Sequence, residues 1–420
     1  MKEKLAINGG TKKFDEEVER YNSIGKEELL AATKVIESGT LSQFLGEKDQ
    51  DFYGGPKIRE FENRWSEYFK VQYSVSVNSC TSGLMVALGA IGLEPGDEVI
   101  VSPWTMCASA TSILIWNAIP VFADIEDETF NLDPQSIEKN ITPNTKAIVV
   151  TNIFGHAAKL HEIMLIAKKY NLRVIEDNAQ APGALCNGEY TGTIGDIGVF
   201  SLNYHKHIHT GEGGMCVTNN AELSERMQLI RNHAEAVVED KGENSLVNMI
   251  GFNFRMGEIE AAIGVEQLKK LPYLINEKVE WAEQLSEGLS SLDCLRTPVV
   301  RDNCSHVYYA YPMLLDIKLN RDTIHNALVA EGIPFLAKEF GLTHLLPIYQ
   351  KKIAYGKSGY PWNGSNYTSN VKYNYGICPT AENILKERYM NFGIGLLALD
   401  KNKITKIIDT FNKVWDELVI

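Results

Sequence analysis

The sequence predicts an α/β protein with a mostly parallel central sheet, helices on both faces of that sheet, and a smaller α+β domain at the C-terminal end. Short apolar runs rich in β-branched residues alternate with helical patterns through the first part of the chain, and this alternation stops after about Gly264. Strands and helices in alternation favour parallel strands joined by crossover helices. A chain of 420 residues also exceeds the usual size of one hydrophobic core. We therefore expect a large domain over residues 1–265, with an N-terminal arm, and a small domain over residues 266–420.

Seven apolar runs predict the strands of the large domain, and they are Tyr73–Val77, Val99–Ser102, Pro120–Ala123, Ala147–Thr151, Arg173–Glu176, Gly198–Leu202 and Met215–Thr218. Amphipathic patterns at Thr81–Ile91 and Leu160–Tyr170 predict two of the helices between them. Ligands of such sheets bind at the carboxyl ends of the strands, so we expect the site in the loops that follow these runs. The elements expected in the small domain are a helix over Gln267–Leu292, a strand over Val307–Leu315, a surface loop over Gly356–Tyr375 and a helix over Lys401–Val419.

Composition and charge exclude several classes of protein. The chain is 44% hydrophobic and 23% charged, which is ordinary for a globular protein and unlike a disordered or fibrous one. Its net charge of -13 argues against nucleic acid or an anionic membrane as the main partner. The seven cysteines form no CxxC pair, and no segment has the pattern of a signal peptide or a membrane span. We expect a cytoplasmic protein with no nucleic-acid partner and no membrane partner.

The most informative segment is Phe200–Lys206, which a glycine-rich turn over Thr210–Gly214 follows. Lys206 comes at the end of a predicted strand, where an apolar pocket would disfavour its ammonium form. A neutral amine is what a Schiff base with a carbonyl cofactor requires. Lysines are mostly exposed, so on its own Lys206 would be interpreted as a solvated loop residue. The motifs around it favour the catalytic interpretation.

Two other junctions carry groups that suit pyridoxal 5'-phosphate (PLP). One predicted strand ends at Glu176 and Asp177, and a carboxylate at that place can pair with the protonated pyridine nitrogen of the cofactor. A helix cap or a structural ion pair is the alternative for Asp177. The segment Asn78–Gly83 places hydroxyls and backbone N–H groups at the start of a helix, which suits a phosphate, although Ser and Thr are also ordinary helix caps.

Further motifs follow one another along the chain, and they are GPKIREFENRWSEYF, NSCTSGL, GDEVIVSPWT, VIEDNAQAPGA, SLNYHKHIHTGEGGM, GFNFRMGEIEAAIG and CPTAENIL. In this order and spacing they resemble the DegT/DnrJ/EryC1/StrS family of PLP-dependent sugar aminotransferases, over nearly the whole chain. The resemblance implies the fold-type-I PLP-dependent transferase fold, PLP as the cofactor and a homodimer with shared active sites. It also implies transfer of an amino group from glutamate to a keto- or aldehydo-sugar, usually nucleotide-linked, for surface polysaccharide or amino-sugar biosynthesis.

The resemblance implies a role for each matching residue. Lys206 would bind PLP covalently, Asp177 would pair with the pyridine nitrogen, and Gln180 would contact the ring hydroxyl. Trp104 would stack on the cofactor ring, although from the residues alone it would be a core tryptophan. The residues that would hold the phosphate are Thr81, Ser82, Ser201 and, from the neighbouring subunit, Asn253, for which a helix cap is the alternative.

Three histidines, His205, His207 and His209, alternate around Lys206. Alternate residues of an extended segment share a face and could hold a metal, but no Cys or carboxylate stands at a partnering spacing, so we expect no metal site. We expect His205 and His209 to contact an anionic substrate in their charged form, and the alternative is that they fix the strand through hydrogen bonds.

Three other functions stay open. The acceptor could be a nucleotide-free sugar acid such as an oxidised octulosonate. A PLP-dependent sugar dehydratase would, by the resemblance, have His in place of Lys206. A non-catalytic sensor of the same fold would not need the set of Lys206, Asp177, Gln180 and Ser201. Segments expected to contact substrate are Gln50–Pro56, His306–Tyr309 and Gly356–Tyr375.

Overall fold

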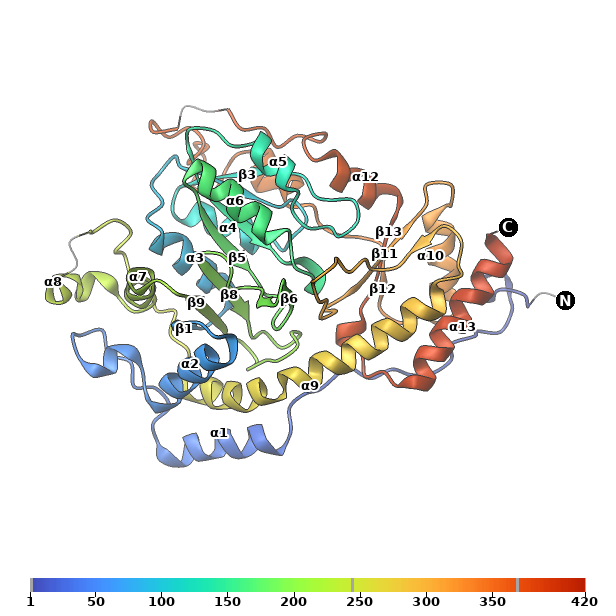
Figure 1. Cartoon of the computed structure of the whole chain (residues 1–420), viewed down its shortest axis with the longest axis horizontal. Coiled ribbons are helices and arrows are strands. Elements are labelled where there is room, and N and C mark those ends of the chain that lie inside the picture. Colours follow the sequence, from blue (N-terminus) through green and yellow to red (C-terminus); the bar gives the residue numbers. More distant parts are fainter. Residues whose placement is uncertain (1–2, 243–244, 368–369, 420) are drawn as a thin grey trace.

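The computed structural model describes residues 3–242, 245–367 and 370–419. Within them, a seven-stranded sheet has the order β1 (Tyr73–Val77), β9 (Gly214–Thr218), β8 (Ile197–Ser201), β5 (Arg173–Asp177), β4 (Thr145–Thr151), β2 (Glu98–Val101) and β3 (Ile119–Phe122) (Figure 1). Strand β9 is antiparallel to both of its neighbours, and the other pairs are parallel. The expected mostly parallel sheet is confirmed, and each predicted strand lies within two residues of the observed one.

Helices cover both faces of this sheet. On one face lie α3 (Cys80–Ala90), α4 (Ala108–Ile115) and α7 (Ala221–Arg231), and on the other lie α2 (Pro56–Phe69), α5 (Pro134–Lys139), α6 (Leu160–Tyr170) and the first part of α9 (Glu258–Leu289). Successive residues of β8 show the alternation, because Val199 belongs to the core under α3 and Phe200 to the core under α2 and α9. Burial on both faces explains why the strands are continuous apolar runs.

A second sheet forms the core of the C-terminal part of the chain, called the small unit below. Its strands are, in order, β10 (Leu295–Arg296), β11 (Tyr311–Leu315), β13 (Tyr389–Phe392) and β12 (Leu336–Ala337), and their pairing is antiparallel. Helices α10 (Arg321–Ala330) and α13 (Lys401–Leu418) pack on it together with the end of α9. The N-terminal residues Leu5 and Phe14 are buried in the same core. Helix α9 runs from the large sheet to this unit (Figure 1), and the division between residues 265 and 266 stays a prediction.

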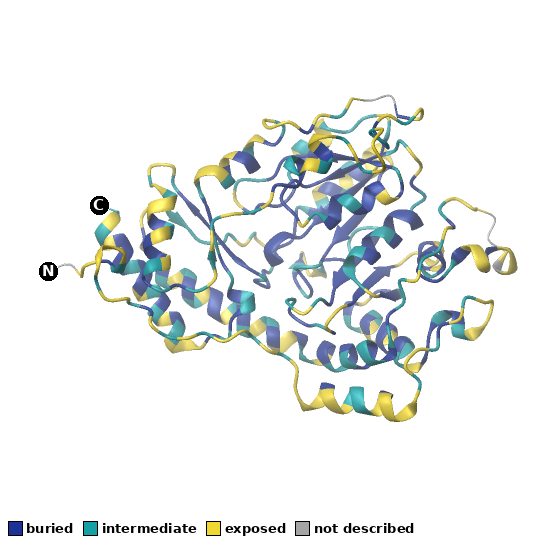
Figure 2. Ribbon diagram, turned by 180° about the vertical axis from the view of Figure 1, so that it is seen from behind, coloured by how far each residue is buried: buried dark blue, intermediate teal, exposed yellow. Residues whose placement is uncertain are grey.

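The remaining α-helices and strands of the described residues are α1 (Lys26–Ser38), α8 (Val238–Lys241), α11 (Pro347–Gln350), α12 (Pro379–Glu387), β6 (Leu185–Cys186) and β7 (Glu189–Tyr190). Helix α1 lies along α9 and presents a largely exposed surface (Figure 2). No helix of the described residues is long and apolar enough to cross a membrane.

Two expectations about the C-terminal part need correction. The long helix begins at Glu258 rather than Gln267, and it continues through Gly264. This glycine lets α9 pack directly on the ring of Phe61, because an added Cβ would lie 2.5 Å from that ring. The segment Gly356–Tyr375 is not simply a surface loop. In its described part Trp362, Tyr367 and Tyr373 are buried, and the Tyr373 hydroxyl donates to the Pro120 carbonyl of β3 at 2.7 Å. Its described residues cover the edge of the sheet and do not line the pocket described below.

Candidate active site

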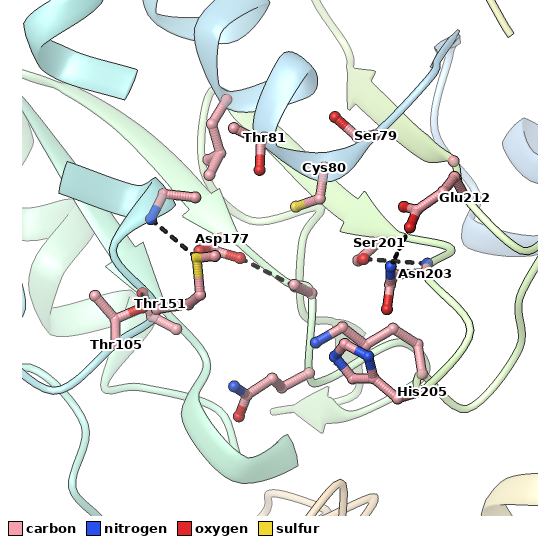
Figure 3. A pocket seen from close by; sticks show the side chains of 17 residues that line it. Ser79, Cys80, Thr81, Thr105, Thr151, Asp177, Ser201, Asn203, His205 and Glu212 are labelled. Atoms are coloured by element: carbon pink, nitrogen blue, oxygen red, sulfur yellow. Dashed lines mark hydrogen bonds between the residues drawn. The ribbon is translucent and has the colours of Figure 1, made fainter. Parts of the chain in front are cut away.

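A pocket of about 190 Å3 opens at the carboxyl ends of β4, β5 and β8, beside the first turn of α3 (Figure 3). This is the edge of the sheet where the sequence predicts a ligand. Six predicted site residues line it, and they are Thr81, Asp177, Gln180, Ser201, His205 and Lys206. The structure therefore brings together residues that stand up to 125 positions apart in the chain.

Asp177 is the last residue of β5, and it lies at the floor of the pocket with 5% of its surface exposed. Burial raises the pKa of its carboxyl group, and a hydrogen bond from Ser109 and the charge of Lys206 act in the opposite direction. The neighbouring carboxylate, Glu176, points to the other side of the strand, where it accepts backbone N–H groups from Gly192, Ile194 and Gly195. The strand alternation thus leaves Asp177 as the carboxylate that faces the pocket.

A chain of hydroxyl groups ends on Asp177. Thr151 Oγ1 donates to Thr105 Oγ1 at 3.1 Å, and the hydroxyls of Thr105 and Ser109 are hydrogen-bonded at 2.9 Å. Ser109 Oγ in turn donates to Asp177 Oδ2 at 2.6 Å. An ionised carboxylate can only accept, so each hydroxyl in the chain is oriented toward Asp177. Such a chain polarises each of its members and stabilises the charged carboxylate. The sequence reasoning missed the role of Thr105, Ser109 and Thr151, although Thr105 ends the quoted motif GDEVIVSPWT and Thr151 ends a predicted strand.

The first turn of α3 forms the second wall. Ser79 caps the helix by accepting the N–H of Ser82 at 3.0 Å, and Thr81 lines the pocket. Ser82 does not line it, because its hydroxyl is buried and donates to Asn78 Oδ1 at 2.6 Å. The expected phosphate contact of Ser82 is therefore corrected, and Ser79 and Cys80 line the pocket in its place.

Glycines allow the opposite wall to approach this turn. An added Cβ on Gly214, at the start of β9, would lie 2.7 Å from the backbone carbon of Ser79. Gly213, which lines the pocket, would bring a Cβ to 2.6 Å from Thr210 Oγ1. The glycine-rich turn is thus required for backbone packing at the site.

Lys206 lies between the pocket and the segment that leads into β11. Its Nζ lies 4.4 Å from the centroid of the Tyr309 ring. Across the pocket, the backbone N–H of Phe154 donates to Gln180 Oε1 at 2.7 Å, and Phe154 adopts a left-handed backbone conformation. With its oxygen held in this way, the amide of Gln180 offers N–H groups to a ligand. Tyr309 lies in the segment His306–Tyr309, which the sequence predicts to contact substrate.

Trp104 does not reach the pocket, and its predicted role is corrected. Its indole ring is fully buried and stacks on Phe340 with ring centroids 5.0 Å apart and an interplanar angle of 11°. Thr105 and Met106 of this loop line the pocket instead, and Met106 is 60% exposed. A bulky apolar residue near the end of a strand can turn to either side of the backbone, and the alternative of a core tryptophan is the correct one.

The three histidines do not share one face. His207 is buried, and its Nε2 is bonded to the Val307 carbonyl at 2.7 Å. His205 lines the pocket, and His209 lines a second pocket next to it. Burial and the charge of Lys206 lower the pKa of His205 to about 4, and burial lowers the pKa of His209. Both shifts favour the neutral imidazole near neutral pH, and the expected contact of His205 and His209 with an anionic substrate stays a prediction.

The second pocket, of about 130 Å3, shares His205 and Lys206 with the first. Its other lining residues come from the N-terminal arm, the turn before Lys206 and the small unit, and they are Arg20, Tyr21, Ser23, Tyr204, His209, Gly395 and Leu396. Lys206 therefore stands where two pockets meet. The sequence reasoning missed the N-terminal arm, because nothing in its local pattern shows where it folds back.

Asn253 lies outside the pocket of its own chain. It is exposed, and its Oδ1 accepts a hydrogen bond from Arg255 Nε at 2.8 Å. Its predicted contact with the neighbouring subunit stays a prediction.

The residues of the first pocket fit PLP. A buried carboxylate, Asp177, suits a protonated ring nitrogen, and Lys206 provides an amine opposite it. Within the described residues, Asn203 Oδ1 is buried in the pocket wall without a hydrogen-bond partner, so a ligand could satisfy a polar atom there. Thr81, Ser201 and the first turn of α3 offer hydroxyl and N–H donors to an anion.

Comparisons with known proteins agree with this geometry. The model of the DegT/DnrJ/EryC1/StrS aminotransferase family matches residues 23–373. GDP-perosamine synthase of Caulobacter vibrioides is 37% identical over 300 residues, which are 70% of this chain and 79% of that protein. The spore coat polysaccharide biosynthesis protein SpsC of Bacillus subtilis is 34% identical, over 82% of this chain and 88% of that protein. The structure of an aminotransferase from Psychrobacter cryohalolentis superposes with a TM-score of 0.80 at 26% identity and covers 96% of this chain and 100% of its own.

Proposed function

The chain belongs to the DegT/DnrJ/EryC1/StrS aminotransferase family and is a PLP-dependent transaminase, and from this premise we propose that it moves an amino group from glutamate to a keto- or aldehydo-sugar. We expect the sugar to be nucleotide-linked and the product to serve surface polysaccharide or amino-sugar biosynthesis. Relatives whose names state a nucleotide-linked sugar support this, and they include GDP-perosamine synthase. The observation that carries the proposal is the position of Lys206, which faces the buried Asp177 in one pocket and opens to a second pocket on its other side.

In the first pocket, we propose that Lys206 binds PLP covalently and that Asp177 pairs with the pyridine nitrogen. Gln180 would donate to the ring oxygen, and Met106 would cover one face of the ring. The donors for the phosphate would be Thr81, Ser201 and the backbone N–H groups of the first turn of α3. When bound, PLP supplies an electron sink at the carbon that loses or gains the amino group.

The residues of this chain would then handle protons and orientation. Lys206 Nζ would take a proton from the donor and return one to the acceptor, since it stands between the two pockets. The hydroxyl chain from Thr151 to Ser109 would keep the buried carboxylate of Asp177 ionised while it pairs with the pyridine nitrogen. The ring of Tyr309, 4.4 Å from Lys206 Nζ, would limit the positions of the amine and exclude water from it.

The acceptor sugar would occupy the second pocket. Arg20 offers a guanidinium group there, which suits a phosphate or a carboxylate of the acceptor. His205 and His209 offer neutral imidazoles for sugar hydroxyls. A nucleotide-linked sugar and a nucleotide-free sugar acid both carry an anionic group, so Arg20 does not select between them.

We further propose a homodimer in which Asn253 contacts the phosphate of the partner's cofactor, and a location in the cytoplasm. The exposed position of Asn253 supports a contact outside its own chain. The exposed apolar residues Leu29, Leu30 and Ile36 of α1 support a surface for contact with the second subunit at this helix (Figure 2).

The test is a half-reaction. The enzyme is first converted with glutamate to the amino form of its cofactor, the donor is removed, and candidate acceptors are offered one at a time while the visible spectrum is recorded. Return of the original absorption band with a nucleotide-linked keto-sugar is the expected result. Return only with a nucleotide-free keto- or aldehydo-sugar acid would assign the alternative acceptor. Release of a dehydrated sugar without transfer of nitrogen, or no band on the purified protein, would contradict the proposed function.

A further inference from the structure

Cys186 and Cys304 face each other across two extended segments that lie outside the proposed active site. Cys186 ends β6, the first strand of a hairpin whose turn, Asn187 and Gly188, has the positive φ angles of a tight two-residue turn. The segment around Cys304 runs antiparallel beside this strand, as an isolated bridge between the two cysteines.

The backbone hydrogen bonds on either side define the geometry of the pair. Asn187 N–H donates to the Asn303 carbonyl at 2.8 Å, and Ser305 N–H donates to the Leu185 carbonyl at 2.9 Å. These bonds flank Cys186 and Cys304, so the two residues form a non-hydrogen-bonded antiparallel pair. Residues in such a pair have Cα atoms about 4.5 Å apart, which lies within the roughly 4.4–6.8 Å range of disulfides. Both thiols are free, and the Cys304 thiol is close enough to contribute to the raised pKa of Cys186.

We propose that Cys186 and Cys304 form a reversible intramolecular disulfide, and that this bond is a redox-sensitive link between the β6–β7 hairpin and the segment that leads to Tyr309. The backbone already holds both residues in register, so the bond can form with little movement of either segment. Cys304 is only partly buried, so small oxidants and reductants can reach it, while Cys186 is buried behind it.

The reaction is a thiol–disulfide exchange with a low-molecular-weight disulfide such as oxidised glutathione. The Cys304 thiolate attacks one sulfur of that disulfide, which forms a mixed disulfide and releases one thiolate that takes up a proton. Cys186 then loses its proton and attacks Cys304 Sγ, and the second small thiol leaves. The protein loses two thiol hydrogens, and the small disulfide is reduced to two thiols. Burial and the neighbouring Cys304 raise the pKa of Cys186 to about 12, so Cys304 acts as the attacking thiol and Cys186 as the resolving one.

The linked segment continues to the pocket. Three residues after Cys304, the Val307 N–H donates to the Gly155 carbonyl at 2.9 Å and the Val307 carbonyl accepts from His207. Two residues further, the ring of Tyr309 lies against Lys206. Closing the bond would therefore anchor the segment that carries Tyr309 to the hairpin, and opening it would release that anchor.

The test uses the full-length holoenzyme with Cys294 replaced by serine, because the exposed thiol of Cys294 would otherwise form its own mixed disulfides. The protein is equilibrated in mixtures of reduced and oxidised glutathione, trapped by acid, denatured, and examined by thiol titration and intact mass. We expect the six remaining thiols to fall to four, with a mass loss of two hydrogens and no added glutathione. Non-reducing peptide mapping should find the peptides of Cys186 and Cys304 joined, and dithiothreitol should separate them.

The matched control carries Cys304→Ser in the same Cys294→Ser background, and it should retain all five of its thiols without a linked peptide. A Cys186→Ser variant in that background should instead keep glutathione on Cys304, since no resolving thiol is present. The proposal is overturned if the Cys294→Ser protein keeps six thiols at every glutathione ratio, or if it accumulates stable glutathione on Cys304 with no linked peptide. Neither outcome depends on transaminase activity, so it is separable from a failure of the proposed function.

Discussion

Replacing Ser109 with alanine tests the hydroxyl chain that ends on Asp177. Ser109 Oγ donates to the carboxylate at 2.6 Å, and Ser109 and Asp177 are 0% and 5% exposed, so water has little access to replace the lost donor. A hydrogen bond to a charged group contributes about 1.5–3 kcal/mol, and about 1.4 kcal/mol corresponds to a tenfold change in rate. We expect kcat/KM for glutamate to fall by about tenfold or more, since Asp177 must stay charged opposite the ring nitrogen.

The pH profile of this variant has a defined sign. Burial raises the pKa of Asp177 and the Ser109 hydrogen bond opposes that rise, so alanine at position 109 raises the pKa further. The active form is the carboxylate, which is lost as the pH falls through this pKa. The acidic limb of kcat/KM should therefore move to higher pH in Ser109→Ala.

The control is Ser112→Ala, one turn along the same helix. Ser112 is also fully buried, but its hydroxyl donates to the Ser109 carbonyl at 3.4 Å and does not touch Asp177. Steady-state kinetics over pH and titration of the apoenzyme with PLP, followed by the visible band, measure both variants. Equal losses in the two variants, or an unmoved acidic limb in Ser109→Ala, would refute a role of the hydroxyl chain in charging Asp177.

Three further predictions concern Lys206 and its surroundings. Borohydride reduction and peptide mapping should find the cofactor on Lys206, and Lys206→Ala should still bind PLP but lose turnover by many orders of magnitude; cofactor trapped on another lysine would contradict the assignment. Mixing inactive Lys206→Ala and Asn253→Ala subunits should restore one active site per hybrid dimer, and hybrids that form without activity would count against shared sites. Replacing His205 or His209 with Asn should raise KM for the acceptor with little effect on the glutamate half-reaction. For His205 the rise in KM should be by the same factor from about pH 6 to about pH 8, because its imidazole is neutral over that range. Equal losses in both half-reactions would contradict a contact with the acceptor.

The central fold was predictable because its strands are buried on both faces. Tyr73–Val77 was predicted at the bounds that β1 has, since a short β-branched run between polar segments has few alternative structures. The start of α9 was predicted nine residues too late, at Gln267 rather than Glu258, and Gly264 lies inside the helix, where its small size serves contact with Phe61. The Asn187–Gly188 turn was also overlooked, although such a pair is a strong local signal for a hairpin.

The site was predictable where sequence position determines spatial position. Asp177 and Ser201 end β5 and β8, which are neighbours in the sheet, so two strand ends 24 residues apart meet at one edge. The same rule cannot decide between Trp104 and Met106. Both follow β2 within a few residues, and which of them faces the pocket depends on the Phe340 ring that stacks on Trp104 from a distant part of the chain.

The residues that were missed share one physical property, which is that they act through a partner supplied by another element. Ser109 matters because it reaches Asp177 of β5, and Thr151 matters because it reaches Ser109 through Thr105. Neither has a spacing of its own that indicates chemistry, since a serine inside a helix and a threonine at the end of a strand are ordinary residues. Local sequence therefore predicts the groups that react, and tertiary contacts determine the groups that set their charge and position. Ser109 belongs to the groups that set charge and position, and comparing Ser109→Ala with its Ser112→Ala control can separate a chemical role of Ser109 from a structural one.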